Sequence, residues 1–173
     1  MAEGLLLALL PPPELAARVR AFRSAHGIVD AAAEPHVTLL RSGADLVRAQ
    51  WEQAGHRLAG QLTAPEVALG GARVFGNGAA LYLAVSLQSD TTLPEALRRV
   101  AADLHGRPGG NLHLSVALNR RGVDLGALLP PARHAFDDLE TTPLCWTPPA
   151  LTLLHKAGVG AAYRPVQAWA FAH

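Results

Sequence analysis

Short apolar runs of strand length recur along the chain and alternate with segments in which apolar residues have helical spacing. Runs of about four to eight apolar or β-branched residues between turn residues are typical of buried strands. These predicted strands are Leu5–Leu10, Pro35–Leu40, Ala64–Leu69, Ala72–Phe75, Ala80–Leu87, Leu112–Leu118, Ala150–Lys156 and Pro165–Phe171. The sequence Gly76-Asn77-Gly78 predicts a hairpin turn between two of them.

Helices are predicted between several of these strands. The expected ranges are 14–27, 44–60, 94–104 and 122–135. The first opens with an acidic residue behind three prolines and ends near Gly27, which suits a helix C-terminus. Pro130-Pro131 is expected to interrupt the last helix. Residues 143–149, which are bounded by prolines, are expected to form a rigid connector.

The order of these elements repeats once along the chain. Each half begins with an apolar strand, continues with a helix that opens on Pro and Glu, and then reaches a strand with a His-x-hydroxyl sequence. Leu5 precedes His36 by 31 positions, and Leu81 precedes His113 by 32. A period of about 77 residues is too long for a solenoid. We therefore expect two similar lobes, approximately 1–78 and 79–173, related by a pseudo-twofold axis within one domain.

Composition places the chain among ordinary globular domains. It has 173 residues, of which 50% are hydrophobic and 17% charged, and its net charge is +1. These values fit a single folded domain and argue against a disordered chain. No run of five or more Lys and Arg occurs, which argues against a strongly basic nucleic-acid binder but is compatible with a small anionic substrate.

Two further features bear on location. Cys145 is the single cysteine, so neither a disulfide nor a cysteine-based zinc site is expected, in keeping with a reducing cytoplasm. The apolar run Leu5–Leu10 is too short for a membrane span and lacks the flanks of a signal peptide. We expect a cytoplasmic monomer that does not bind membranes.

The two His-x-hydroxyl sequences carry the candidate chemistry. On a strand, His36 and Thr38 project from one face, and His113 and Ser115 do the same 77 residues later. If these strands form opposite walls of one cleft, a neutral imidazole can accept a proton while a protonated one donates a proton. The hydroxyls would donate hydrogen bonds to oxygens between the histidines. A phosphodiester fits such a site, and the chemistry requires no metal or other cofactor.

Other interpretations of these residues stay open. A single His-x-Thr on an apolar strand is usually structural, so the case for function rests on the matched pair. Zinc binding by His36 and His113 is less well supported, because no carboxylate or third His lies at ligand spacing on either strand. The sequence also lacks His-Glu-x-x-His, a Gly-x-x-x-x-Gly-Lys phosphate loop and a Gly-x-Ser-x-Gly elbow. No metal site is predicted.

With His36-Val37-Thr38-Leu39 and His113-Leu114-Ser115-Val116, the chain resembles the two-histidine (2H) phosphoesterase superfamily, in its 2′-5′ RNA ligase-like and cyclic phosphodiesterase branch. The resemblance covers nearly the whole chain. It implies an α+β, bilobal pseudo-twofold fold, with two antiparallel sheets flanking a central cleft and helices on the outside. It also implies metal-independent opening of 2′,3′-cyclic phosphates on nucleotides or RNA ends, or action on 2′-5′ linkages.

The resemblance assigns roles to the motif residues. His36 and His113 would be the acid/base pair, and Thr38 and Ser115 would hold the phosphate oxygens. Which histidine is the base depends on the orientation of the substrate. Ligase-like relatives often carry an Arg five positions after the second His, where this chain has Leu118, and this departure favours hydrolysis over ligation. A non-catalytic module that binds nucleotides or RNA ends is a further alternative.

Three residues outside the motifs are candidates for substrate binding. Arg41 lies five positions after His36. The equivalent position after His113 is Leu118, so only the first motif has an Arg at this offset. Lys156, the only lysine, follows a predicted strand and would neutralise a phosphate, although a solvated strand end is as good an interpretation. Tyr82 and Tyr163 are suited to stacking on a base, although packing is the more frequent role of such residues, and Tyr82 is taken as the candidate.

Overall fold

The computed structural model describes residues 3–28, 33–43, 45–88 and 92–172. The helices are α1 (Pro13–Ala25), α2 (Arg48–Gln61), α3 (Leu93–Leu104), α4 (Leu125–Ala135) and α5 (Asp137–Thr141). The strands are β1 (Gly4–Leu9), β2 (Val37–Arg41), β3 (Val67–Val74), β4 (Ala80–Leu87), β5 (Arg107–Pro108), β6 (His113–Leu118), β7 (Leu144–Trp146), β8 (Ala150–Lys156) and β9 (Arg164–Ala170).

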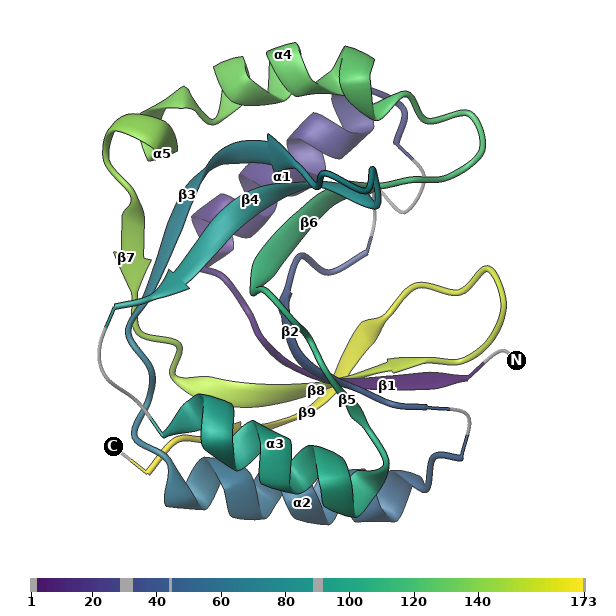
Figure 1. The fold of residues 1–173 in the computed structure, drawn as a ribbon, viewed down its shortest axis with the longest axis vertical. Coiled ribbons are helices and arrows are strands. Elements are labelled where there is room, and N and C mark those ends of the chain that lie inside the picture. Colours follow the sequence, from purple (N-terminus) through teal and green to yellow (C-terminus); the bar gives the residue numbers. More distant parts are fainter. Residues whose placement is uncertain (1–2, 29–32, 44, 89–91, 173) are drawn as a thin grey trace.

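The strands form an antiparallel sheet in two halves. The order is β7-β3-β4-β6-β2-β1-β8-β9, and β5 pairs with β2 beside this path. One half contains β7, β3, β4 and β6, and the other contains β2, β1, β8 and β9. The halves meet where β6 pairs with β2, in a register that sets Val37 opposite Leu114. We call this junction the seam, and Figure 1 shows the two halves splaying apart from it.

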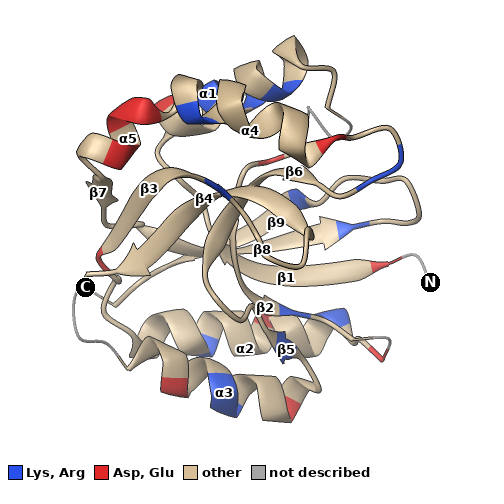
Figure 2. Ribbon diagram, turned by 45° about the horizontal axis from the view of Figure 1, so that its top comes forward, with Lys and Arg blue, Asp and Glu red and all other residues tan. Residues whose placement is uncertain are grey.

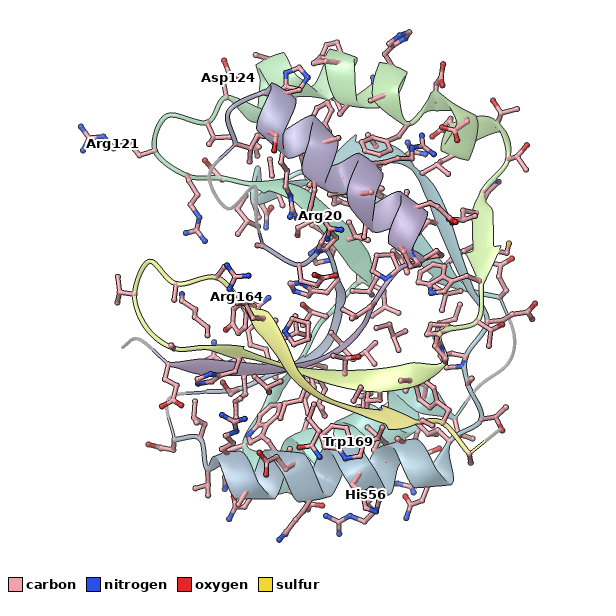
Figure 3. All side chains as sticks on the ribbon, turned by 180° about the vertical axis from the view of Figure 1, so that it is seen from behind. Arg20, His56, Arg121, Asp124, Arg164 and Trp169 are labelled. Carbon is pink, nitrogen blue, oxygen red and sulfur yellow. The ribbon has the colours of Figure 1, made fainter. Side chains whose placement is uncertain are left out.

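Helices cover the outside of both halves. α1, α4 and α5 pack against strands of the β7-β3-β4-β6 half, whereas α2 and α3 pack against the other half (Figure 1). Trp169 of β9 lies against α2 (Figure 3), and its ring fills the space that a Cβ at Gly55 would need. The predicted α+β fold of two lobes with antiparallel sheets and outer helices is confirmed. Among the described residues, no helix has the length and apolar character of a membrane span.

Each lobe takes its elements from both halves of the sequence. β1 and β2 pair with each other in one lobe, but α1, which connects them, packs against β6 of the other lobe. In the same way, α3 follows β4 in the chain and packs against α2 and β2. The expected boundary near residue 78 falls in the turn of the β3–β4 hairpin, inside one lobe. The sequence repeat therefore corresponds to two lobes that exchange a helix, and not to two consecutive halves.

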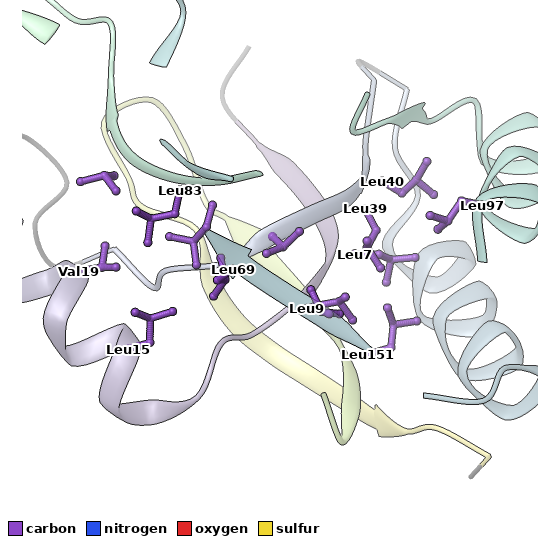
Figure 4. Close-up of a cluster of buried hydrophobic side chains, with 14 of the residues drawn as sticks. Leu7, Leu9, Leu15, Val19, Leu39, Leu40, Leu69, Leu83, Leu97 and Leu151 are labelled. Carbon is purple, nitrogen blue, oxygen red and sulfur yellow. The ribbon is translucent and has the colours of Figure 1, made fainter. Parts of the chain in front are cut away.

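The apolar runs are continuous because the inner strands are covered on both faces. On β1, Leu5, Leu7 and Leu9 enter the main core, whereas Leu6 and Ala8 form a second cluster on the opposite face. Figure 4 shows the main core, in which side chains from helices of both lobes meet those of the strands. The labelled residues are Leu7, Leu9, Leu15, Val19, Leu39, Leu40, Leu69, Leu83, Leu97 and Leu151.

Three local predictions were wrong. Residues 143–149 are more than a connector, because β7 lies within them and pairs with β3 at the edge of the sheet. Pro130 and Pro131 lie inside a continuous α4, whose start is capped by the Asp124 carboxylate accepting from the Ala127 amide. The two glycines at 70 and 71 do not divide β3, which instead shifts register there against β4.

Candidate active site

A cavity of about 560 Å³ lies at the seam between the two lobes. Its wall contains the histidine and the hydroxyl residue of both motifs: His36, Thr38, His113 and Ser115. Further lining residues come from α1, from the end of β6 and from the loop between β8 and β9. The structure therefore brings together in one cavity all four motif residues that the sequence singles out.

The register at the seam explains how the motifs meet. Val37 and Leu114 lie opposite each other, and both side chains are fully buried. Because side chains alternate along a strand, the residues on either side of them face the cavity. Extending the antiparallel register by one residue each way aligns His36 with Ser115 and Thr38 with His113. Each imidazole is thus aligned with the hydroxyl residue of the other motif.

A β-bulge follows the hydroxyl residue in both motifs. On β2, the pairing with β1 passes from Thr38 to Leu40 and skips Leu39. On β6, the pairing with β4 passes from Ser115 to Ala117 and skips Val116. Bulges bend a strand and redirect the side chains beside them, and they are frequent next to active sites. The bulges lie at equivalent positions of the two motifs, so the pseudo-twofold relation extends to the backbone.

The two imidazoles are oriented in the same way. The Nδ1 atom of His36 lies 2.8 Å from the Glu34 carbonyl oxygen, and Nδ1 of His113 lies 2.8 Å from the Asn111 carbonyl oxygen. A carbonyl oxygen only accepts, so Nδ1 of each ring must carry the hydrogen and donate it. In the neutral form of either ring, the lone pair is therefore on Nε2. This tautomer provides one nitrogen per histidine for proton transfer.

Burial distinguishes His36 from its partner. Desolvation lowers the pKa of His36 below its ordinary value, although the Glu34 carbonyl opposes this effect. The positive charges of Arg23 and Arg41 and the neighbouring His113 lower the pKa further. The neutral form of His36 is thus favoured near neutral pH. Thr38 beside it is 9% exposed, so the first motif lies deep in the cavity wall.

Aromatic rings support the second histidine. Phe75 and Tyr82 stack with ring centroids 4.0 Å apart, and both meet His113 edge-on, at 4.8 and 5.7 Å. Tyr82 is not among the residues that line the cavity, and its ring packs edge-on against His113. Tyr163, from the loop between β8 and β9, does line the cavity, with its ring 6.4 Å from that of His36.

Cationic side chains make the cavity attractive to anions. Arg23, Arg41, Arg120 and Lys156 all line it, and Glu34 is the acidic residue of the lining. The Lys156 Nζ atom lies 5.9 Å from the ring centroid of Tyr163, within cation–π range. Figure 2 shows basic residues at the adjoining ends of β8 and β9 and on the loop after β6, whereas the acidic residues of α5 lie on the opposite side. The sequence candidates Arg41 and Lys156 are therefore at the cavity.

A sequence profile of the 2′-5′ RNA ligase superfamily matches residues 11–160. The chain belongs to this superfamily. Its members are two-histidine phosphoesterases, and this membership supports an enzyme that acts on phosphodiester bonds. No curated protein sequence matches the chain.

Solved structures agree with this assignment in fold. Escherichia coli LigT complexed with NADP⁺ is 19% identical, with 99% of each chain covered and a TM-score of 0.62. LigT complexed with 3′-AMP is also 19% identical, with 99% of each chain covered and a TM-score of 0.60. TT0787 of Thermus thermophilus is 20% identical over 99% of this chain and 98% of its own, with a TM-score of 0.62.

In this two-histidine phosphoesterase, sequence reasoning missed Arg23 and Arg120 and passed over Tyr163 in favour of Tyr82. Arg23 had a detectable signal: it lies four positions after Val19, on the buried stripe of α1, where an arginine is unexpected. Arg120 follows the end of β6, and neither its spacing nor its neighbours distinguish it in the sequence.

The potential metal ligands are dispersed. Within the part of the chain that the structure describes, no group of three or more His, Cys, Asp or Glu side chains has the arrangement to hold a metal ion. His155, one of the remaining histidines, pairs with Glu3 at 2.9 Å and does not line the cavity.

Proposed function

We propose that this protein opens 2′,3′-cyclic phosphates of nucleotides or RNA ends, without a metal, by acid–base catalysis at His36 and His113. The observation that carries this proposal is the convergence of both motifs on one cationic cavity. Each imidazole there is held in the same tautomer by a backbone carbonyl. Two such groups can divide the work, because one takes up a proton while the other releases one.

In the proposed reaction, His36 acts as the general base and His113 as the general acid. The lowered pKa of His36 favours its neutral form, whose Nε2 takes a proton from a water molecule. The water oxygen bonds to phosphorus, and the bond between phosphorus and the ribose 2′ or 3′ oxygen breaks. The protonated Nε2 of His113 gives its proton to that leaving oxygen. The product is a phosphate monoester, and each turnover leaves the proton count of the pair unchanged.

The remaining candidates bind the phosphate in this scheme. Thr38 and Ser115 donate hydrogen bonds to the non-bridging oxygens, while Arg41 and Lys156 offset the negative charge that develops on them. LigT has been crystallised in complex with 3′-AMP and with phosphate, so a protein of similar fold binds a nucleoside monophosphate of the product class. The likeness supports a nucleotide substrate for the present chain.

The direct test is turnover of 2′,3′-cyclic AMP in ¹⁸O-labelled water, with and without EDTA. We expect one labelled oxygen in the 2′- or 3′-phosphate product and an unchanged rate with the chelator. Loss of activity in EDTA would contradict the metal-free mechanism. Tight nucleotide binding without turnover, over all cyclic and linear candidates, would instead favour a non-catalytic binding module.

A second candidate function is joining or cleavage of 2′-5′ bonds. The superfamily profile favours it by name. Leu118, which lines the cavity, stands five positions after His113, where ligase-like relatives often carry Arg. Incubation with half-tRNA-like ends and with a 2′-5′ dinucleotide separates the two activities. Joining of the ends or cleavage of the dinucleotide at a rate above that on the cyclic nucleotide would replace the first proposal.

The proposal includes a monomer acting in the cytoplasm. The cytoplasmic location rests on the single cysteine, which fits a reducing compartment. Sedimentation at micromolar concentration checks the oligomeric state, and a sedimenting species of twice the chain mass of 18.2 kDa would contradict it.

A further inference from the structure

Arg23 occupies an unusual place for an arginine. It lies in the last turn of α1, is 7% exposed and forms part of the cavity wall. Its guanidinium donates from three nitrogens to three carbonyl oxygens: Nε to Val116 at 3.0 Å, Nη2 to Ser115 at 2.8 Å and Nη1 to Ala33 at 2.9 Å. Charged groups are rarely buried unless their donors are satisfied, so this position is a specific feature of the fold.

Two of the three carbonyls belong to the second motif, and the third lies just before the first. Ser115 and Val116 are the hydroxyl residue and the bulge residue of the second motif. Ala33 lies in the segment that leads into the first motif, one residue before the Glu34 carbonyl that orients His36. Between the lobes, β2 and β6 pair at Val37 and Leu114. Arg23 adds a second connection across the seam, on the cavity side.

The first motif has an equivalent contact made by the backbone. The carbonyl of its bulge residue, Leu39, accepts from the Gly109 amide at 3.0 Å. In the second motif, the carbonyl of the bulge residue Val116 accepts from Arg23 Nε at 3.0 Å. A carbonyl in a bulge lies off the regular ladder and needs a donor when buried. The Arg23 side chain thus provides the hydrogen-bond donor for the bulge carbonyl of the second motif, as the Gly109 amide does for the bulge carbonyl of the first.

We propose that Arg23 is a positioning residue of the active site, which holds the second motif's bulge and ties it to the segment that carries His36. Its planar fork of donors suits this task, because the geometry of three fixed nitrogens sets the direction of each carbonyl. A lysine keeps the charge but cannot reproduce the fork. The role in catalysis rests on the proposed phosphodiester chemistry, whereas the structural connection can be tested without turnover.

Arg23 also contributes charge next to His36. The groups that act on this imidazole are Arg23 from α1, Arg41 from β2 and His113 from β6, with the ring of Tyr163 facing it from the β8–β9 loop. Loss of a positive charge at position 23 stabilises the protonated imidazole. Arg23→Lys keeps the positive charge but loses the fork of donors, whereas Arg23→Met loses both. Comparing the two variants therefore separates the geometric contribution of Arg23 from its electrostatic one.

The experiment compares Arg23→Lys and Arg23→Met with Arg18→Met as the control. Arg18 is on the same helix and donates to Asp138 and Ala135, away from the cavity. For each protein we would measure kcat and KM on 2′,3′-cyclic AMP against pH, the titration of the histidine rings by NMR, and binding of inorganic phosphate. Thermal melting establishes how much of each variant is folded.

We expect both Arg23 variants to lose about 100-fold in kcat, since small misplacements of reacting groups have effects of this order. Arg23→Met should also raise the pH at which His36 titrates and weaken phosphate binding, whereas Arg23→Lys should leave that titration near the wild-type pH. Arg18→Met should change neither activity nor titration. A purely structural role would lower stability and leave the folded fraction of Arg23→Lys with the wild-type kcat.

Two outcomes distinguish failure of this inference from failure of the proposed function. If the wild-type protein does not open the cyclic phosphate but Arg23→Lys, which keeps the charge, still weakens phosphate binding, the function is wrong and the positioning role holds. If the folded fraction of Arg23→Lys retains wild-type kcat and phosphate binding, the positioning role is overturned, whatever the titration of Arg23→Met. If Arg23→Met does not fold, Arg23→Lys alone tests the positioning role. A loss of kcat in Arg23→Lys supports that role, and a wild-type kcat overturns it.

Discussion

Val37 of β2 lies opposite Leu114 of β6, and each follows directly after the histidine of its motif. The strands of the two lobes pair at this point, and the pairing sets the relative position of His36 and His113. Both side chains are fully buried, so the seam is anchored by apolar packing while the neighbouring positions face the cavity. The geometry of the site is therefore a consequence of the core beneath it.

The lowered pKa of His36 predicts the acidic limb of the pH–rate profile. The base must be neutral, so kcat/KM should rise as the pH increases through the His36 pKa, which lies below the ordinary value of about 6.5. Arg41→Met removes a nearby positive charge, and this should raise the pKa and move the limb to higher pH. A limb that is unmoved in the variant would contradict the role of His36 as base.

The same shift has a consequence for stability. Since the folded pKa of His36 is lower than the unfolded one, the unfolded chain binds more protons below a pH of about 6.5. The contribution of this histidine to stability is present above that pH and is lost as the pH falls through the folded pKa. Urea unfolding of wild type and His36→Gln over this range should show a smaller loss in the variant.

Thr38→Val and Ser115→Ala test the two hydroxyls. Each removes a donor to the phosphate while keeping most of the side-chain volume, and a lost hydrogen bond to a charged group is worth about 1.5 to 3 kcal/mol. We expect kcat/KM on 2′,3′-cyclic AMP to fall by about 10- to 100-fold, with stability nearly unchanged. Ser86→Ala, at an exposed strand position outside the cavity, is the control. Wild-type kinetics for both motif variants would exclude the hydroxyls from phosphate binding.

Tyr82 is predicted to support His113 and not to contact a base. Tyr82→Phe keeps the stack on Phe75 and the edge contact with His113, so its KM should match the wild type for every nucleobase. Tyr82→Ala removes the ring and should lower kcat through a less ordered imidazole. A KM for cyclic nucleotides that changes with the base in Tyr82→Phe would show that the tyrosine does contact the substrate.

Gly109 approaches the first motif so closely that no side chain fits. A Cβ at this position would overlap the Thr38 carbonyl. Gly109→Ala should therefore displace the first motif, lowering both thermal stability and kcat. Gly60→Ala is the matched control, because Gly60 is an exposed position near the end of α2 with open space around it. That helix substitution should stabilise the protein by about 0.5 to 1 kcal/mol without affecting activity.

Much of this arrangement is readable in the sequence, because strands and motifs are local patterns. The apolar runs locate β4 and β8 to the residue, and the spacing of His36 and His113 indicates a duplicated site. The exchange of α1 and α3 between the lobes is not readable, since the repeat fixes the order of elements but not the neighbours they pack against. The role of Arg23 is not predictable for a related reason. Its three hydrogen-bond partners are backbone carbonyls, which every residue type has, so the sequence does not indicate them.

The central claim is that His36 and His113 act as one acid–base pair. The measurement is single-turnover hydrolysis of 2′,3′-cyclic AMP by His36→Gln, His113→Gln and the double variant, with His134→Gln at an exposed position as the control. Each single variant should lose about 100- to 10,000-fold in rate, and the double variant should be little worse than either, because the residues act as a unit. Wild-type rates in either single variant, or losses that multiply in the double variant, would contradict the claim.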